Sequence, residues 1–128
     1  MSYRPTATPS LFPYLSCLHG DGSNTRRYIY GADVADAITC IMHKGSIGET
    51  YNIGTKFEIS NKELAKYIIQ EMGLGGQSDQ LLEFVSDRPF NDLRYAVDSA
   101  KLEKMGWKAQ VPFQEGLEKT SKKVKSLS

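Results

Sequence analysis

The stretch DVADAITCIMHKG, residues 33–45, decides the fold, because it is the clearest helix in the sequence. Its apolar side chains recur at helical spacing and form one stripe: Val34, Ala37, Ile38, Ile41 and Met42. Asp33 is predicted to cap the first turn, and Gly45 after Lys44 is a typical stop signal. An apolar stripe needs a neighbouring element to cover it, so the sequence predicts a folded domain around this helix.

Three short segments are predicted as strands. Residues 26–30 alternate in side-chain type and lead toward the helix. Residues 50–53 follow a turn at Gly48 and end at Gly54, and residues 82–85 form a later apolar run. Strand signals and helix signals are therefore mixed along the chain.

Three further helices are predicted after the first one. Ser60 and Glu63 form a capping box in front of a helix that runs to Met72. Asp98 is predicted to cap a short helix, and Pro112 fits the first turn of a final one. The fold class is therefore mixed α/β, without the full run of βα units that an independent doubly wound sheet needs.

Length and composition describe a domain of ordinary size. The chain has 128 residues, of which 40% are hydrophobic and 24% charged, and a formal net charge of +1. So small a charge provides no whole-protein field to attract nucleic acid or an acidic membrane. The longest apolar stretches also fall far short of the ~20 residues that span a bilayer. We therefore expect no nucleic-acid partner and no membrane partner.

The N-terminal region differs from the rest of the chain. Residues 1–16 contain three of the five prolines and no strand or helix period, so we expect residues 1–17 to be an irregular lead-in and residues 18–128 to be the domain. The start is not a convincing secretory signal, and Cys17 and Cys40 are then expected to be reduced. A cytoplasmic location follows as an expectation.

The short motifs that mark cofactor and catalytic sites are absent from the sequence. The GDG at residues 20–22 continues to Thr25 instead of completing G-x-G-x-x-G, and no serine lies in G-x-S-x-G. The two cysteines, each close to a histidine, lack the paired spacing of structural zinc sites. We therefore predict no catalytic, cofactor-binding or metal-binding residue in this chain.

Candidate binding residues lie in non-helical segments. Arg26 and Arg27 lie on a predicted strand, and a guanidinium can grip a diphosphate through two parallel hydrogen bonds. Ion pairs with Asp21 or Asp33 would explain them at least as well. Residues 86–94 concentrate two arginines, two aspartates and an asparagine. Ordering such a segment is costly unless its charges pair with each other or with an anionic ligand, and the pattern leaves both open.

Asn61 lies just inside the Ser60 cap, at a helix N-terminus. Free N–H groups there and the helix dipole favour an anion. An ordinary first-turn asparagine also explains the residue, and the sequence alone favours that explanation.

Three blocks of sequence, taken together, carry a resemblance. They are HGDGSNTR at residues 19–26, GETYNIGT at residues 48–55, and DRPFND at residues 87–92 followed by RY at residues 94–95. In order and spacing they resemble the C-terminal portion of the nucleotide-sugar 4,6-dehydratases, typified by dTDP-glucose 4,6-dehydratase and the dehydratase part of plant-type rhamnose synthases. The likeness covers about residues 18–120. These enzymes are extended short-chain dehydrogenases/reductases.

The resemblance implies an α/β fold that is the substrate-binding C-terminal part of such an enzyme, an incomplete Rossmann-type fold. It implies that Arg26 contacts the nucleotide diphosphate, that Asn61 lies in the nucleotide pocket, and that residues 87–91 hold the nucleoside end. The substrate-binding residues implied in this way are Arg26, Asn61, Asp87, Arg88 and Asn91. The bacterial form of the loop has Gly-His where this chain has Phe-Asn at residues 90–91.

The resemblance also implies what the chain lacks. In that family an N-terminal Rossmann half binds NAD, and the reaction needs a tyrosine with a lysine four residues later. No tyrosine of this chain has a lysine at that spacing, so we expect no cofactor in this chain and NAD only in the full-length family. The chain resembles a truncated or alternatively started gene product.

We therefore predict the nucleotide-sugar-binding portion of a dTDP-glucose 4,6-dehydratase-like protein, from a deoxysugar or rhamnose-type pathway, that is inactive alone. Its ligand would be a nucleotide sugar of the dTDP- or UDP-glucose type. The alternative is a non-catalytic interaction module that binds a full-length homologue or another partner. A homo-oligomer is a further expectation about partners.

Overall fold

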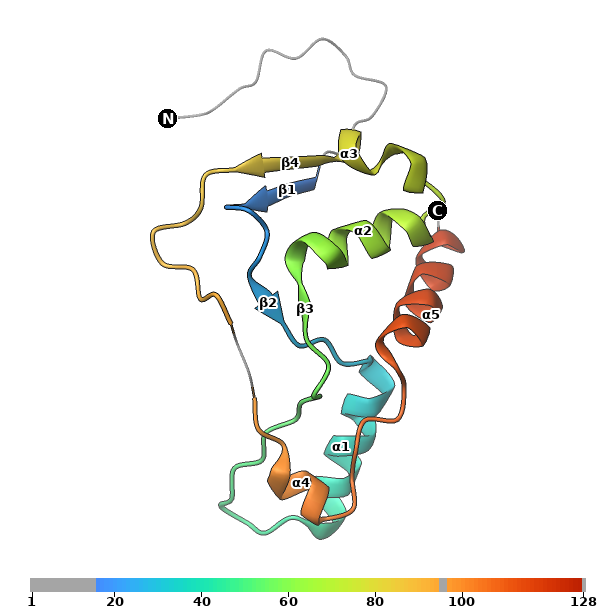
Figure 1. The fold of residues 1–128 in the computed structure, drawn as a ribbon. Helices are drawn as coiled ribbons and strands as arrows, with labels where there is room; N and C mark the ends of the chain where they lie inside the picture. The colour runs from blue at the N-terminus through green and yellow to red at the C-terminus, as the bar shows by residue number, and fades with distance from the viewer. Residues whose placement is uncertain (1–15, 95–96, 128) are drawn as a thin grey trace.

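The structure, a computed structural model, describes residues 16–94 and 97–127. Strands β1 (Ser16–His19) and β4 (Leu82–Val85) lie with α2 (Asn61–Glu71) at one end of the molecule (Figure 1). Helices α1 (Gly31–Lys44) and α4 (Ala100–Lys104) lie at the other end. The α/β class predicted from the sequence is confirmed.

Two small sheets form the strand part of the fold. β1 pairs in parallel with β4, with Ser16 opposite Leu82 and His19 opposite Val85. β2 (Thr25–Arg26) pairs antiparallel with β3 (Ile59–Ser60). The β1 strand begins inside the expected lead-in of residues 1–17, whose first fifteen residues lie outside the described part of the chain.

Two strand predictions need correction. Of residues 26–30, only Arg26 lies in a strand, and residues 27–30 lead into α1 without pairing. Residues 50–53 form no strand either, although Tyr51 and Ile53 pack against the core. An extended segment becomes a strand only where a neighbouring strand offers backbone partners, and among the described residues neither segment pairs with a strand.

The prediction that Asp33 caps α1 is wrong. The helix begins at Gly31, and its N-cap residue Tyr30 makes no side-chain cap bond. Asp33 lies within the first turn and is only 2% exposed. Its carboxylate accepts the backbone N–H groups of Gln110 at 3.1 Å and Val111 at 3.0 Å. The Asp33 carboxylate therefore makes a tertiary contact with the segment of residues 110–111 instead of capping its own helix.

The capping box of α2 is confirmed. The Glu63 amide donates to the Ser60 hydroxyl at 3.2 Å, and the Ser60 amide donates back to the Glu63 carboxylate at 3.2 Å. After this helix, a 3₁₀ turn (Gly75–Gln77) and the short α3 (Ser78–Leu81) lead to β4. These two short elements were not predicted, since a glycine-rich segment shows no helical period.

The two later helices lie where the sequence predicts them, but each begins one residue later than predicted. The N-cap of α4 is Ser99, which makes no side-chain cap bond, and Asp98 before it accepts the amide of Ala100 at 2.9 Å. Helix α5 (Phe113–Lys125) begins immediately after Pro112, which is its N-cap residue instead of part of its first turn. None of the helices in the described residues is both long and apolar enough to span a membrane.

A buried hydrophobic cluster lies between α1, α4 and the segment after α4. Ala37 and Leu102 are 0% exposed, and Trp107 is 7% exposed. The Trp107 indole donates to the backbone carbonyl of Asp33 at 3.2 Å. The predicted stripe of α1 is only partly covered, because Ile38 and Met42 are 49% and 79% exposed.

Candidate functional site

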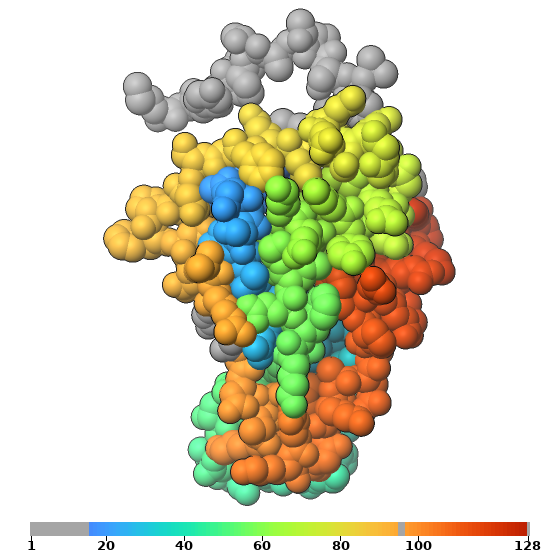
Figure 2. All heavy atoms as spheres, in the orientation of Figure 1, coloured from blue at the N-terminus to red at the C-terminus, as the bar shows by residue number. Residues whose placement is uncertain are grey.

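A pocket of about 430 Å³ lies at the other end of the molecule, between β1, the start of α2 and the segment of residues 86–94. In Figure 2 the β1 region (blue) lies between this segment (yellow to orange) and α2 (green). The pocket brings together four of the five predicted binding residues: Arg26, Asn61, Arg88 and Asn91. These residues come from three separate stretches of the chain.

The first of them, Arg26, is held by backbone carbonyls. Its Nη1 donates to the carbonyl of Thr25 at 2.7 Å and to that of Asp92 at 2.9 Å. Among the described residues its other guanidinium N–H groups have no hydrogen-bond partner, so they can donate to a ligand. It makes no ion pair with Asp21 or Asp33 there, which removes the alternative explanation for this residue.

Asn61 is the first residue of α2 and lines the pocket. The idea of free amides at this helix N-terminus is wrong, because its first three N–H groups all have acceptors in the chain. Asn61 donates to the carbonyl of Asn24 at 2.9 Å, Lys62 donates to that of Gly22 at 3.0 Å, and Glu63 donates to Ser60. The side chain of Asn61, rather than a backbone amide, can therefore reach a ligand.

The segment of residues 86–94 is braced from within. The Asp87 carboxylate accepts the side-chain amide of Asn91 at 2.9 Å and the backbone amide of Arg88 at 2.8 Å. These two bonds, the Asn91 bond first, lower the pKa of Asp87 below its ordinary value. Asp87 is absent from the pocket lining and instead orients Asn91, which is part of it.

Gly20 allows Asp87 to come this close to β1. A Cβ atom at position 20 would lie 3.1 Å from the Asp87 carboxylate, and the φ of Gly20 is +63°. That left-handed backbone suits glycine best. The amide of Gly20 also donates to the carbonyl of Val85 at 2.9 Å, which extends the pairing of β1 and β4 by one bond.

His19 is a pocket residue that the sequence analysis did not single out. Its Nδ1 lies 3.3 Å from the carbonyl of Ser86, and its Nε2 lies 3.5 Å from Nη2 of Arg88. Both contacts are satisfied when Nδ1 carries the ring proton, so that Nε2 accepts from Arg88. His19 then holds the guanidinium of Arg88 at the carboxyl ends of the two parallel strands. The role of His19 follows only from its position in β1, a strand that was not predicted from the sequence.

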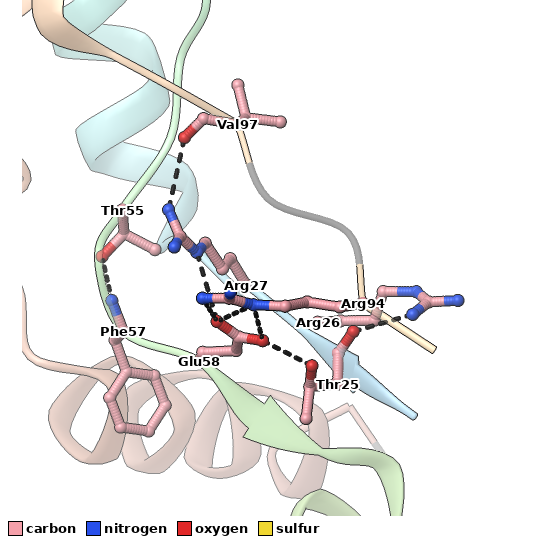
Figure 3. A network of polar contacts seen from close by, with 8 residues as sticks. All are labelled: Thr25, Arg26, Arg27, Thr55, Phe57, Glu58, Arg94 and Val97. Atoms are coloured by element: carbon pink, nitrogen blue, oxygen red, sulfur yellow. Dashed lines mark hydrogen bonds and ion pairs between the residues drawn. The ribbon is translucent and has the colours of Figure 1, made fainter. Parts of the chain in front are cut away.

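Glu58 is a second residue that no sequence pattern singled out. Its carboxylate accepts three bonds from Arg94: Nε donates to Oε1 at 2.8 Å and to Oε2 at 3.0 Å, and Nη2 donates to Oε2 at 2.8 Å (Figure 3). It also accepts one bond from the hydroxyl of Thr25. Arg27 lies against the same carboxylate, with its Nε 3.7 Å from Oε2. These contacts, with the Arg94 bonds first, lower the pKa of Glu58 from 4.5 to about 2.

The arginines around the pocket therefore divide into two groups. Arg27 and Arg94 are paired with Glu58, whereas Arg26 and Arg88 line the pocket. The pocket lining also includes apolar side chains of α2, among them Leu64 and Ile68. A pocket lined by two arginines and by apolar side chains suits an anionic ligand that also carries an apolar or flat part.

The described residues contain no cradle for a dinucleotide cofactor. Gly20 and Gly22 both have positive φ, but the turn they form connects β1 to β2 and does not open a helix. The glycines at residues 73–76 follow α2. The described residues also hold no group of three or more His, Cys, Asp or Glu side chains suited to a metal ion.

The sequence profile of one family, described as GDP-mannose 4,6 dehydratase, matches residues 13–120. The chain belongs to this family. Within it, the chain is 45% identical over 107 residues to dTDP-D-glucose 4,6-dehydratase of Mus musculus, a match that covers 81% of this chain and 30% of the mouse protein. The predicted relation to the nucleotide-sugar 4,6-dehydratases is confirmed.

A plant relative in the dehydratase family is a larger protein. It is the trifunctional UDP-glucose 4,6-dehydratase/UDP-4-keto-6-deoxy-D-glucose 3,5-epimerase/UDP-4-keto-L-rhamnose-reductase of Arabidopsis thaliana. It is 46% identical over 103 residues, which are 80% of this chain and 15% of the plant protein. This chain therefore spans less than a third of either relative's length.

Solved structures of a dehydratase and of an epimerase share the fold. The dTDP-glucose 4,6-dehydratase of Streptomyces venezuelae, solved with NAD bound, superimposes with a TM-score of 0.80 at 32% identity, over 88% of this chain and 34% of that one. UDP-glucose 4-epimerase of Thermotoga maritima, solved with UDP-glucose, gives 0.76 at 28% identity, over 89% and 36%. The fold is that of a part of an extended short-chain dehydrogenase/reductase, as predicted.

Proposed function

We propose that this chain binds the nucleoside diphosphate part of a nucleotide sugar in the pocket between β1, α2 and residues 86–94. One observation carries the proposal: Arg26 and Arg88 line the same pocket, together with Asn61 and Asn91. Two guanidinium groups can bind the two phosphates through charge-assisted hydrogen bonds. The two asparagines offer both donors and acceptors to the sugar or the base.

The relatives support this class of ligand. The mouse relative is named for dTDP-D-glucose and the plant relative for UDP-glucose. The Thermotoga maritima epimerase was solved with UDP-glucose. We therefore propose a nucleotide sugar of the dTDP- or UDP-glucose type, in deoxysugar or rhamnose-type metabolism.

We further propose that the chain does not catalyse dehydration alone. It has no tyrosine followed four residues later by lysine, and its described glycine turns do not form a dinucleotide cradle. Incubation with dTDP-glucose or UDP-glucose and NAD is expected to leave the sugar unchanged, as followed by chromatography of the nucleotide sugars. Formation of a 4-keto-6-deoxy product by the purified chain would contradict this part of the proposal.

Calorimetric titration with dTDP and UDP tests the binding proposal. We expect saturable binding, and we expect Arg26→Ala and Arg88→Ala each to weaken it about tenfold or more, because each removes charged hydrogen bonds worth roughly 1.5–3 kcal/mol. Lys104→Ala is the control, since it removes one positive charge from α4 at the opposite end of the molecule. The absence of saturable binding, or equal affinity in all four proteins, would contradict the proposal.

A second function is favoured by the exposed apolar face of α1. Ile38 and Met42 lie one turn apart on this helix and are 49% and 79% exposed. We propose as the alternative that this face binds a full-length homologue. Sedimentation of a mixture should then show a complex that Ile38→Glu with Met42→Glu abolishes, whereas sedimentation of each protein at its own rate would contradict the alternative.

A further inference from the structure

We propose that Glu58 is a positioning residue for the nucleotide pocket: it fastens the end of residues 86–94 to β2 and thereby places Arg88 and Asn91 at the ligand. The inference rests on the proposed binding function. It concerns a residue outside the pocket lining, and it predicts that affinity depends on a carboxylate that does not touch the ligand.

The first argument is the position of Glu58 between two segments that line the pocket. It lies directly before β3, and its side chain is 20% exposed. From the β2 side it accepts the hydroxyl of Thr25, and from the far side it accepts Arg94 through both carboxylate oxygens (Figure 3). One carboxylate thus joins β2 to the end of residues 86–94.

The second argument is that Glu58 acts where the backbones of β2 and of residues 93–94 already contact each other. The amide of Thr25 donates to the carbonyl of Leu93 at 2.8 Å, and Thr25 forms an isolated bridge with Arg94. The carbonyl of Asp92 accepts from Arg26 at 2.9 Å and from the Asn24 side chain at 3.1 Å. Glu58 therefore reinforces a short contact that fixes one end of the segment, while β4 fixes the other end.

The third argument is the alternation of side chains along β2 and the residue that follows it. Thr25 and Arg27 contact Glu58, whereas Arg26 between them lines the pocket. Because the three residues share one backbone, a shift of β2 away from Glu58 also moves Arg26. Glu58 is thus linked to both arginines of the pocket, to Arg26 through β2 and to Arg88 through the segment of residues 86–94.

The fourth argument is charge. Arg27 and Arg94 share the single carboxylate of Glu58, and Nε of Arg27 is buried without a hydrogen-bond partner among the described residues. Loss of the carboxylate leaves two guanidinium groups close together with no counter-charge. Their repulsion acts on the contact between β2 and residues 93–94, which is where the segment is attached.

Titration of Glu58 and Arg94 variants with dTDP and UDP tests the inference. We expect Glu58→Ala and Arg94→Ala each to weaken binding about fivefold. The double variant should bind no more weakly than either single variant, because each substitution removes the same contact between Glu58 and Arg94. Glu58→Gln keeps the shape of the side chain and replaces Glu58→Ala in the test if the alanine variant folds poorly. We expect it to lose less affinity than Glu58→Ala. Glu118→Gln, which loses the ion pair with Lys122 on α5, is the control and should bind as the unaltered chain does.

Amide hydrogen exchange separates positioning from general loss of stability. In Glu58→Gln we expect faster exchange at the amide of Thr25 and unchanged exchange at the amide of Trp107, which donates to Leu102 in the distant core. Unaltered Thr25 exchange, or an equal increase at both amides, would overturn the inference, as would unaltered affinity in Glu58→Ala. If the unaltered chain binds neither nucleotide, the binding proposal fails, and the exchange at Thr25 alone decides whether Glu58 holds the segment.

Discussion

Asp33 joins the beginning of α1 to the segment in front of α5. Its carboxylate accepts two backbone amides, and its own carbonyl accepts the indole of Trp107. Because Asp33 is only 2% exposed, water cannot replace the lost acceptor in Asp33→Ala. We expect this variant to lose about 2–4 kcal/mol of unfolding free energy, for two amides left without a partner. Urea denaturation followed by Trp107 fluorescence measures it, with the exposed Asp36→Ala as control; equal losses in both variants would contradict the assignment.

Glu58 should make stability depend on acid pH. Its pKa is lowered from 4.5 to about 2, first by the bonds from Arg94 and then by the bond from Thr25. A carboxylate with a lowered folded pKa stabilises the protein fully above its unfolded pKa and progressively less as the pH falls toward its folded pKa. The difference in unfolding free energy between the unaltered chain and Glu58→Gln should therefore be constant above about pH 4.5 and shrink between pH 4.5 and about 2. Denaturant titrations across this range measure it, and a difference that stayed constant down to pH 2 would count against the ion-pair network.

At the residue scale, the sequence identified side-chain types but not their partners. Arg26 and Arg27 are neighbours of the same type, yet one lines the pocket and the other pairs with Glu58. The direction of a side chain depends on strand pairing, which brings residues 25, 58 and 94 together from distant parts of the chain. No local pattern encodes such a meeting, so Glu58 and His19 could not be selected in advance.

Among the elements, α2 has the strongest local start signal, and its capping box can be tested. Ser60→Ala removes the bond from the amide of Glu63 and should cost about 1 kcal/mol of unfolding free energy. The matched control is Ser46→Ala, at an exposed serine that caps no helix. Thermal or urea unfolding measures both, and an equal effect of the two substitutions would show that the capping box adds no stability. Asn61 follows the cap directly, so nucleotide affinity is a second readout of the same variant.

Helices were easier to predict than strands for a physical reason. The start of α2 and the end of α1 depend on residues within four positions of each other, such as Ser60 with Glu63 and Gly45 with Ile41. The strand β1 has a single buried residue, Leu18, and becomes a strand only because β4 lies beside it. Residues 50–53 show the opposite case, since their strand-like sequence finds no partner among the described residues.

The cluster around Leu102 and the pocket lie at opposite ends of the molecule. Ala37, Leu102 and Trp107 form the buried cluster at the α1 and α4 end, whereas the pocket lies at the β1 and α2 end. The family likeness extends over both ends, since it covers residues 13–120. Buried apolar side chains such as Leu18, Ile59 and Ile69 also lie at the pocket end, so both ends contribute to stability, while the proposed ligand contacts lie at one end only.

This separation predicts that a core defect lowers stability without changing nucleotide affinity. Leu102 is 0% exposed, so Leu102→Ala should cost about 2–5 kcal/mol of unfolding free energy through the cavity it leaves. Distant sites act additively, so dTDP or UDP at about 100 times its dissociation constant should stabilise both the unaltered chain and Leu102→Ala by about 2.7 kcal/mol. Urea denaturation with and without nucleotide measures both quantities, and Leu102→Val serves if the alanine variant is largely unfolded. A much smaller ligand effect in the variant would mean that the two ends do not fold as one cooperative unit, because the pocket would then unfold separately from the core.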